Sequence, residues 1–147
     1  MLAREGPNMK ILVPVDGSAY SLKAVETACD LAKSQAPSTI TLVAAVMQVP
    51  ELEEGVYITE KMTAQAKIAL AKAKDVVQAK GLAADEIVAM GPSPAEEIVK
   101  TASNQKSDLI VIGSRGLAGK TKSFLGSTAS QVVTYSPCSV LVVKTQD

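Results

Sequence analysis

Glycines and hydroxyl side chains gather at two places near the end of the chain. Gly113 and Gly116 directly follow the apolar run at residues 109–112, and Gly126 stands directly before two hydroxyl residues. Glycine lacks the Cβ atom that blocks a close approach, and it permits positive φ, so that successive N–H groups can turn toward an anion. The pattern predicts a phosphate-binding loop at the carboxyl end of a strand, which is where open α/β sheets bind their ligands.

Hydroxyl and cationic side chains around these glycines favour the same interpretation. Ser127 and Thr128 would open a helix, whose free N–H groups and dipole attract negative charge. Arg115, Lys120 and Lys122 place positive charge in the same connection. The alternative is that the glycines mark ordinary turns and that the basic side chains are solvated. Glycines on both sides of a basic connection favour the phosphate site.

Better-known phosphate motifs do not fit the same residues. A P-loop that ended at Gly119, Lys120 and Thr121 would need a glycine at position 114, which is Ser114. No G-x-G-x-x-G sequence follows the first apolar segment, so a Rossmann dinucleotide site is not expected. The sequence therefore predicts a glycine loop of another kind.

The chain contains no histidine, which limits the chemistry that its side chains can perform. Neither a Ser/His nor a Cys/His pair can form, and the commonest general base near neutral pH is missing. The cysteines and carboxylates are not spaced as metal ligands, and Glu51, Glu53 and Glu54 are interpreted as a solvated loop. We predict no catalytic residue and no metal held by side chains alone. Magnesium would arrive with a nucleotide, bound mainly by its phosphates.

Apolar segments and helix signals alternate along the chain. Ser93, Pro94 and Glu96 combine a capping serine, a proline in the first turn and a capping-box glutamate. Gly81 is placed to end the preceding helix. Strands are expected at about 10–15, 40–46, 85–90, 108–112 and 138–144, and helices at about 19–35, 57–80, 94–104 and 127–135. This alternation predicts an α/β fold with a doubly wound parallel sheet in one domain.

Three segments resemble one known family. Gly113, Gly116, Gly126 and Ser127 match the pattern G-x2-G-x9-G-[ST], which is the ATP-binding signature of the universal stress protein family. Residues 11–18 (ILVPVDGS) and 136–143 (SPCSVLVV) are similar to that family's first and last strands. The resemblance covers the chain from Met9 to Lys144. Members that keep the glycine pattern are the ATP-binding kind.

The resemblance also implies a strand order. It is 3-2-1-4-5 in a five-stranded parallel sheet with helices on both faces, a Rossmann-like fold of the adenine nucleotide alpha hydrolase type. In that order the topological switch point lies between strands 1 and 4. The carboxyl ends of these two strands carry Pro14, Val15 and Asp16 on one side and Ile112 and Gly113 on the other. The glycine signal and the topology therefore point to the same crevice.

Residue roles follow from the resemblance. Asp16 is similar to the residue that contacts the nucleoside end and assists a metal, although it could equally be a turn aspartate before Gly17 or belong to a helix cap near Ser18. Pro14 and Ala45 match adenine-pocket positions, and Ile112 would line the same pocket. Phosphates and ribose would be held by Gly113, Gly116, Gly126, Ser127 and Thr128. Val15 and Arg115 complete the set of residues expected to contact the nucleotide.

Composition narrows the class of protein and its partners. The 147 residues suit one domain, which we place at residues 9–147, preceded by a disordered extension at residues 1–8. Fifteen basic and fifteen acidic residues cancel, and aromatic residues are 3% of the chain, so nucleic acid is not an expected partner. No apolar run approaches the roughly 20 residues of a membrane span, and no export signal is present, so we expect a cytoplasmic location.

The last strand predicts self-association. Residues 138–144 would form an apolar sheet edge, which favours pairing across a two-fold axis, and the resemblance implies the same homodimer. Three functions remain open. The first is an ATP-binding stress-response or signalling regulator with unknown protein partners. The second is a slow adenine-nucleotide hydrolase, and the third is a dimeric interaction module that binds no nucleotide.

Overall fold

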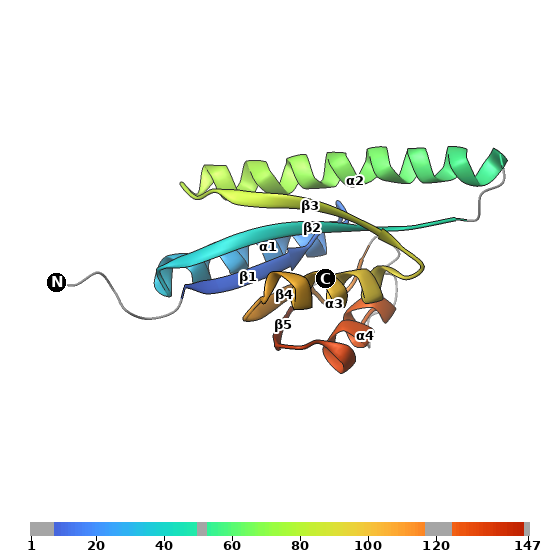
Figure 1. Cartoon of the computed structure of the whole chain (residues 1–147). Helices are drawn as coiled ribbons and strands as arrows, with labels where there is room; N and C mark the ends of the chain where they lie inside the picture. Colours follow the sequence, from blue (N-terminus) through green and yellow to red (C-terminus); the bar gives the residue numbers. More distant parts are fainter. Residues whose placement is uncertain (1–7, 50–52, 117–124, 146–147) are drawn as a thin grey trace.

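The computed structural model describes residues 8–49, 53–116 and 125–145, and its strands and helices alternate throughout (Figure 1). The strands are β1 (Met9–Pro14), β2 (Ser38–Met47), β3 (Ala84–Gly91), β4 (Leu109–Gly113) and β5 (Ser139–Val143). The helices are α1 (Ala19–Ser34), α2 (Glu53–Ala79), α3 (Pro94–Gln105) and α4 (Ser127–Tyr135). The extension predicted at residues 1–8 lies, except for Asn8, outside the described residues.

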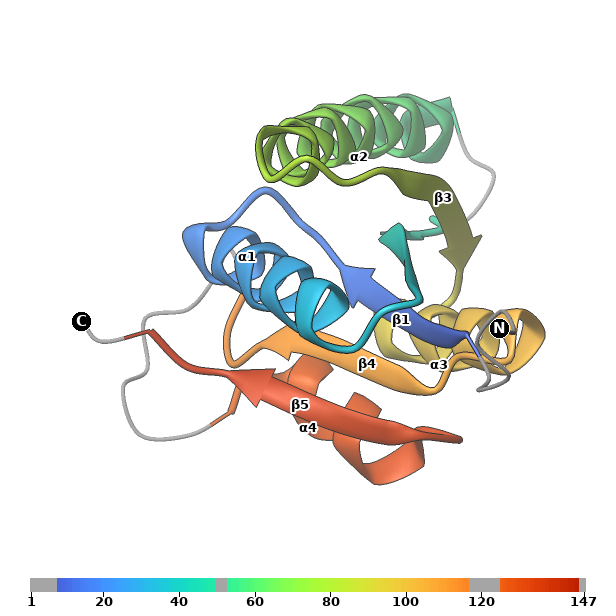
Figure 2. The same ribbon diagram turned by 90° about the vertical axis from the view of Figure 1, so that its left-hand side faces the viewer.

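The five strands form one parallel sheet in the order β3-β2-β1-β4-β5. This order confirms the predicted doubly wound fold. Helices α1 and α2 cover one face of the sheet, and α3 and α4 cover the other, as Figure 1 and Figure 2 show from two directions. The connection that follows β1 leads to α1 on one face of the sheet, and the connection that follows β4 leads to α4 on the other face. A crevice therefore opens between these connections at the carboxyl ends of the two strands.

Alternation along β1 builds two separate cores. Ile11 and Val13 join the cluster under α1 and α2, whereas Leu12 joins the cluster under α3 and α4. All three side chains are buried, as expected when successive residues of a parallel strand face opposite, helix-covered sides. The central strands are therefore fixed in register from both faces, which keeps their carboxyl ends in place.

The start of α2 corrects one prediction. We expected a helix from about residue 57 and a solvated loop containing Glu53 and Glu54, but the helix begins at Glu53. Gly55, two residues into the helix, resembles a helix break when it is considered from local sequence alone. Glu51 lies outside the described residues.

Helix ends follow the sequence signals more closely. Ser93 caps α3 through its Oγ, which accepts a hydrogen bond from the N–H of Glu96, and Pro94 occupies the first turn. Gly81 has a φ of +78° directly after α2, and the N–H of Leu82 donates to the carbonyl of Val77. These contacts confirm the predicted cap and the predicted glycine stop.

Gly17 has a φ of +88° in the turn between β1 and α1, a conformation that an L side chain rarely adopts. We expect Gly17→Ala to lower the free energy of unfolding by about 1–2 kcal/mol, since alanine must adopt a left-handed conformation there. Gly17→Asn is the control and should lose less, because asparagine tolerates this region better. Urea unfolding of both variants measures the difference, and an alanine variant as stable as the wild type would contradict the prediction.

Candidate functional site

A cavity of about 500 Å³ opens at the carboxyl ends of β1 and β4. Its volume falls within the range of small-molecule sites in proteins. The cavity is lined by all eleven residues that the sequence predicted: Pro14, Val15, Asp16, Ala45, Ile112, Gly113, Arg115, Gly116, Gly126, Ser127 and Thr128. Segments that are about 100 positions apart in the sequence thus meet at the switch point. The predicted cations Lys120 and Lys122 lie outside the described residues.

The cavity is also lined by five residues that the sequence analysis did not predict: Ser21, Pro94, Ile98, Leu125 and Ala129. Most of them come from helix starts, and their side chains are small or apolar. Pro94 carried a signal, because a helix that starts after β3 must begin beside the carboxyl end of β2. Ile98 and Ala129 had no distinguishing residue type, since apolar side chains in an amphipathic helix are ordinarily core residues. Ser21 and Leu125 carried no signal of their own in the local sequence.

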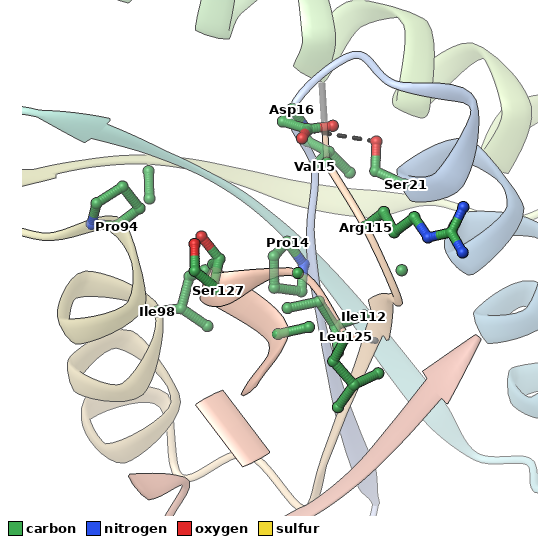
Figure 3. Close-up of a pocket in the computed structure, with 16 residues that line it drawn as sticks. Pro14, Val15, Asp16, Ser21, Pro94, Ile98, Ile112, Arg115, Leu125 and Ser127 are labelled. Carbon is green, nitrogen blue, oxygen red and sulfur yellow. Dashed lines mark hydrogen bonds between the residues drawn. The ribbon is translucent and has the colours of Figure 1, made fainter. Parts of the chain in front are cut away.

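The cavity has an apolar region and a polar region (Figure 3). In the close-up, Pro14, Ile98, Ile112 and Leu125 lie at one part of the site, with Ser127 between Ile98 and Pro14. Asp16, Ser21 and Arg115 lie at the other part. Pro14, Ile98 and Ile112 are buried, so this part of the wall is supported by the core under α3 and α4. Such a surface accommodates a flat apolar group, and the polar part accommodates a charged one.

Asp16 is held by the first turn of α1. Its Oδ1 accepts a hydrogen bond from the N–H of Ser18 at 2.9 Å, and its own N–H donates to Oγ of Ser21 at 3.3 Å (Figure 3). Ser18 caps the helix through its Oγ, which accepts from the N–H of Ser21. The turn-and-cap alternative is therefore present in the geometry. The other carboxylate oxygen, Oδ2, faces Gly116, where a Cβ atom would lie 2.6 Å from it.

Close contacts, and not backbone conformation, distinguish two glycines of the motif. Glycine permits positive φ, but in the described residues the positive-φ glycines are Gly17 and Gly81, and not Gly113, Gly116 or Gly126. A Cβ at Gly113 would lie 2.8 Å from the carbonyl oxygen of Tyr20 in α1. Gly113 thus lets α1 pack on β4, and Gly116 leaves room for the Asp16 carboxylate.

The N-terminus of α4 forms the wall opposite Asp16. Gly126 occupies the cap position with a φ of −60°, and among the described residues no side chain caps the first turn. Helices α1 and α3, by contrast, have serine caps. The first N–H groups of a helix have no intrahelical partner, and the helix dipole adds partial positive charge there. Ser127 and Thr128 add hydroxyl groups, so this end of the cavity favours an anion.

Arg115 lies at the edge of the polar region. Its guanidinium carbon is 5.8 Å from the centre of the Tyr20 ring, within the range of a cation–π contact. Figure 3 shows the side chain directed toward α1 and away from Ser127. Among the described residues, no group of three acidic, cysteine or histidine side chains could hold a metal ion. Over the same residues, no helix has the length and apolar character needed to cross a membrane.

Sequence comparison adds to this geometry. The sequence model of the universal stress protein family matches residues 7–144. The chain belongs to this family. It is 37% identical over 146 residues to universal stress protein YxiE of Bacillus subtilis. The aligned region covers 92% of this chain and 98% of that relative.

Two solved structures have the same fold as this universal stress protein. MJ0577 of Methanocaldococcus jannaschii superposes with a TM-score of 0.82 at 28% identity, covering 94% of this chain and 96% of that one. A universal stress protein solved in complex with cAMP superposes with a TM-score of 0.74 at 27% identity, covering 94% and 98%. Both likenesses extend over nearly the whole domain.

Proposed function

We propose that this universal stress protein binds an adenine nucleotide in the cavity between β1 and β4. The observation that carries the proposal is that one cavity combines an apolar wall with the start of α4, where glycine occupies the cap position. An adenine ring matches the apolar wall in shape and polarity, and a phosphate chain matches the helix start in charge. The relative solved with cAMP supports an adenylate as the ligand.

The proposed ligand is ATP, with Mg²⁺ bound mainly through its phosphates. Adenine would lie against Pro14, Ala45 and Ile112, and Asp16, next to Val15, would contact the nucleoside end. The phosphates and the ribose would be held by backbone and hydroxyl donors of Gly113, Gly116, Gly126, Ser127 and Thr128. Asp16 Oδ2, beside Gly116, could also assist the magnesium ion, because it faces the same part of the cavity.

We further propose that the nucleotide makes the protein a cytoplasmic regulator of a stress response or signalling process. Bound nucleotide would fix the loop from Gly113 to Gly126, most of which lies outside the described residues, and would change the surface that protein partners meet. A homodimer through residues 138–144 is part of this proposal. Leu141 is 37% exposed on β5, which is an edge of the described sheet, and an apolar sheet edge favours pairing.

Slow hydrolysis of the nucleotide is the second candidate function. It is favoured by one observation, the Asp16 carboxylate beside the Gly116 wall, where it could orient a water molecule or a metal ion. Multiple turnovers that are lost in Asp16→Asn would support hydrolysis. Stoichiometric ATP that stays intact in the complex would refute it.

The decisive experiment identifies what the protein carries. We expect purified protein to release ATP or another adenylate on denaturation, identified by chromatography and mass spectrometry. Titration calorimetry with ATP and ADP in the presence of magnesium should then give one site per chain. A protein that carries no nucleotide and also fails to bind ATP would favour the dimeric interaction module instead.

A further inference from the structure

We infer that Arg115 and Tyr20 form a positioning pair for the phosphate end of the cavity, and that Arg115 is not itself a phosphate ligand. This inference rests on the proposed nucleotide function. It revises the role that the sequence suggested for Arg115, which was a cation in direct contact with the nucleotide.

Tyr20 contacts the glycine segment with both its backbone and its ring. A Cβ atom at Gly113 would lie 2.8 Å from the carbonyl oxygen of Tyr20 and 3.1 Å from its Cβ, so the end of β4 packs directly on the first turn of α1. Two residues further on, the guanidinium group of Arg115 lies over the Tyr20 ring. The segment between Gly113 and Arg115 is thus connected to one residue of α1 at both of its ends.

Hydrogen bonds restrain the same segment from two other directions. The N–H of Ser114 donates to the carbonyl of Val143 at 2.9 Å, which connects the segment to β5. The N–H of Gly126 donates to the carbonyl of Ser114 at 2.7 Å, which connects it to the start of α4. Ser114 is 7% exposed, so water competes little for these bonds. Tyr20 supplies the restraint on the α1 side.

The first turn of α1 therefore controls both sides of the polar region. Through Ser18 and Ser21 it fixes Asp16, and through Tyr20 it fixes the segment that leads to Gly116. A Cβ atom at Gly116 would lie 2.6 Å from Oδ2 of Asp16, so either the carboxylate or the backbone would have to shift. A small shift of the Gly116 backbone would change the shape of the anion site, so the contact that holds it is a positioning contact.

The direction of the Arg115 side chain agrees with this role. In Figure 3 it runs toward α1 and away from Ser127, which belongs to the helix start that favours an anion. The charge of the guanidinium group is directed at the face of an aromatic ring, where a cation is attracted by the ring quadrupole.

The test compares Tyr20→Leu, Tyr20→Phe, Arg115→Gln and the double variant Tyr20→Leu/Arg115→Gln by calorimetry with ATP, ADP and AMP at low and high salt. We expect Tyr20→Leu and Arg115→Gln each to weaken all three nucleotides by a similar factor of about two to five, the size of one partly exposed cation–π contact. Tyr20→Phe keeps the aromatic face and should bind all three nucleotides more tightly than Tyr20→Leu. The double variant should lose no more than the weaker-binding single variant, because both changes remove one contact.

If Arg115 instead contacted the phosphates directly, the binding results for these variants would differ. Arg115→Gln would then weaken ATP far more than AMP and would reduce the salt dependence of binding, while Tyr20→Leu would have no effect. That result would overturn the inference, as would losses that add in the double variant or a Tyr20→Phe variant that binds no better than Tyr20→Leu. Thermal unfolding of each variant shows whether the fold is intact. A wild-type protein that binds no adenylate would overturn the proposed function together with the inference.

Discussion

Replacing Gly126 with leucine is expected to lower the affinity for ATP by about 100-fold or more. A Cβ at this position would lie 3.4 Å from Cα of Arg115 and from the carbonyl oxygen of Ser114, and 3.9 Å from the backbone nitrogen of Gly116. A side chain that continues beyond Cβ would therefore fill the space between the two glycines. Under the proposed function, this is the space that the phosphate chain occupies.

Gly126→Ala is the matched control. The φ of −60° suits any residue, and the closest contacts of a Cβ there are of ordinary van der Waals length. We expect the alanine variant to fold like the wild type and to lose less affinity than the leucine variant. Calorimetry measures binding, and circular dichroism with thermal unfolding checks the fold. ATP affinity retained by a folded Gly126→Leu protein would remove the glycine loop from the site.

Val142→Pro is expected to convert the proposed dimer to monomers. Residues of a strand direct their backbone groups to alternate sides, and the carbonyl of Val143 faces β4, where it accepts from Ser114. The backbone groups of Val142 therefore face the open edge. Proline removes the outward N–H without breaking a bond to β4, and edge strands tolerate it there. A two-fold dimer contains this hydrogen bond twice, so the affinity of the two protomers for each other should fall by about 100-fold.

Sedimentation velocity over a range of protein concentrations measures this change. Leu141→Pro is a useful contrast, because its N–H is on the side that faces β4, and its loss should lower the free energy of unfolding of each protomer. A Val142→Pro protein that remains dimeric would place the interface elsewhere. The exposed side chains of Val133 and Tyr135 on α4 would then be the next candidates.

The fold was predictable because each of its elements is marked locally. β1 and β4 are short apolar runs that end at turn residues, and α3 begins with a complete serine, proline and glutamate signal. The start of α2 was not predictable, because Glu53 and Gly55 also suit a loop. Strand order came from family resemblance, since pairing between β1 and β4 depends on contacts almost 100 positions apart.

The motif predicted which residues line the cavity, but it did not predict the contacts that favour glycine at positions 113 and 116. Gly113 and Gly116 are required by Tyr20 and Asp16, two residues near the start of the chain, and such contacts have no signature in the local sequence. Ile98 and Leu125 were missed for a related reason. An apolar side chain that lines a cavity and one that fills a core have the same residue type, and the difference appears only when the helices are packed.

The uncapped start of α4 has a thermodynamic consequence. A side-chain cap contributes about 1 kcal/mol to the stability of a helix, and this short helix begins without one. Under the proposed function, the ligand supplies the missing partner, so occupancy of the cavity and the order of α4 become linked quantities. β5 begins four residues after α4 ends, and it is bonded to the same glycine segment. Nucleotide concentration would then set the local stability of the sheet edge at which two copies are proposed to meet.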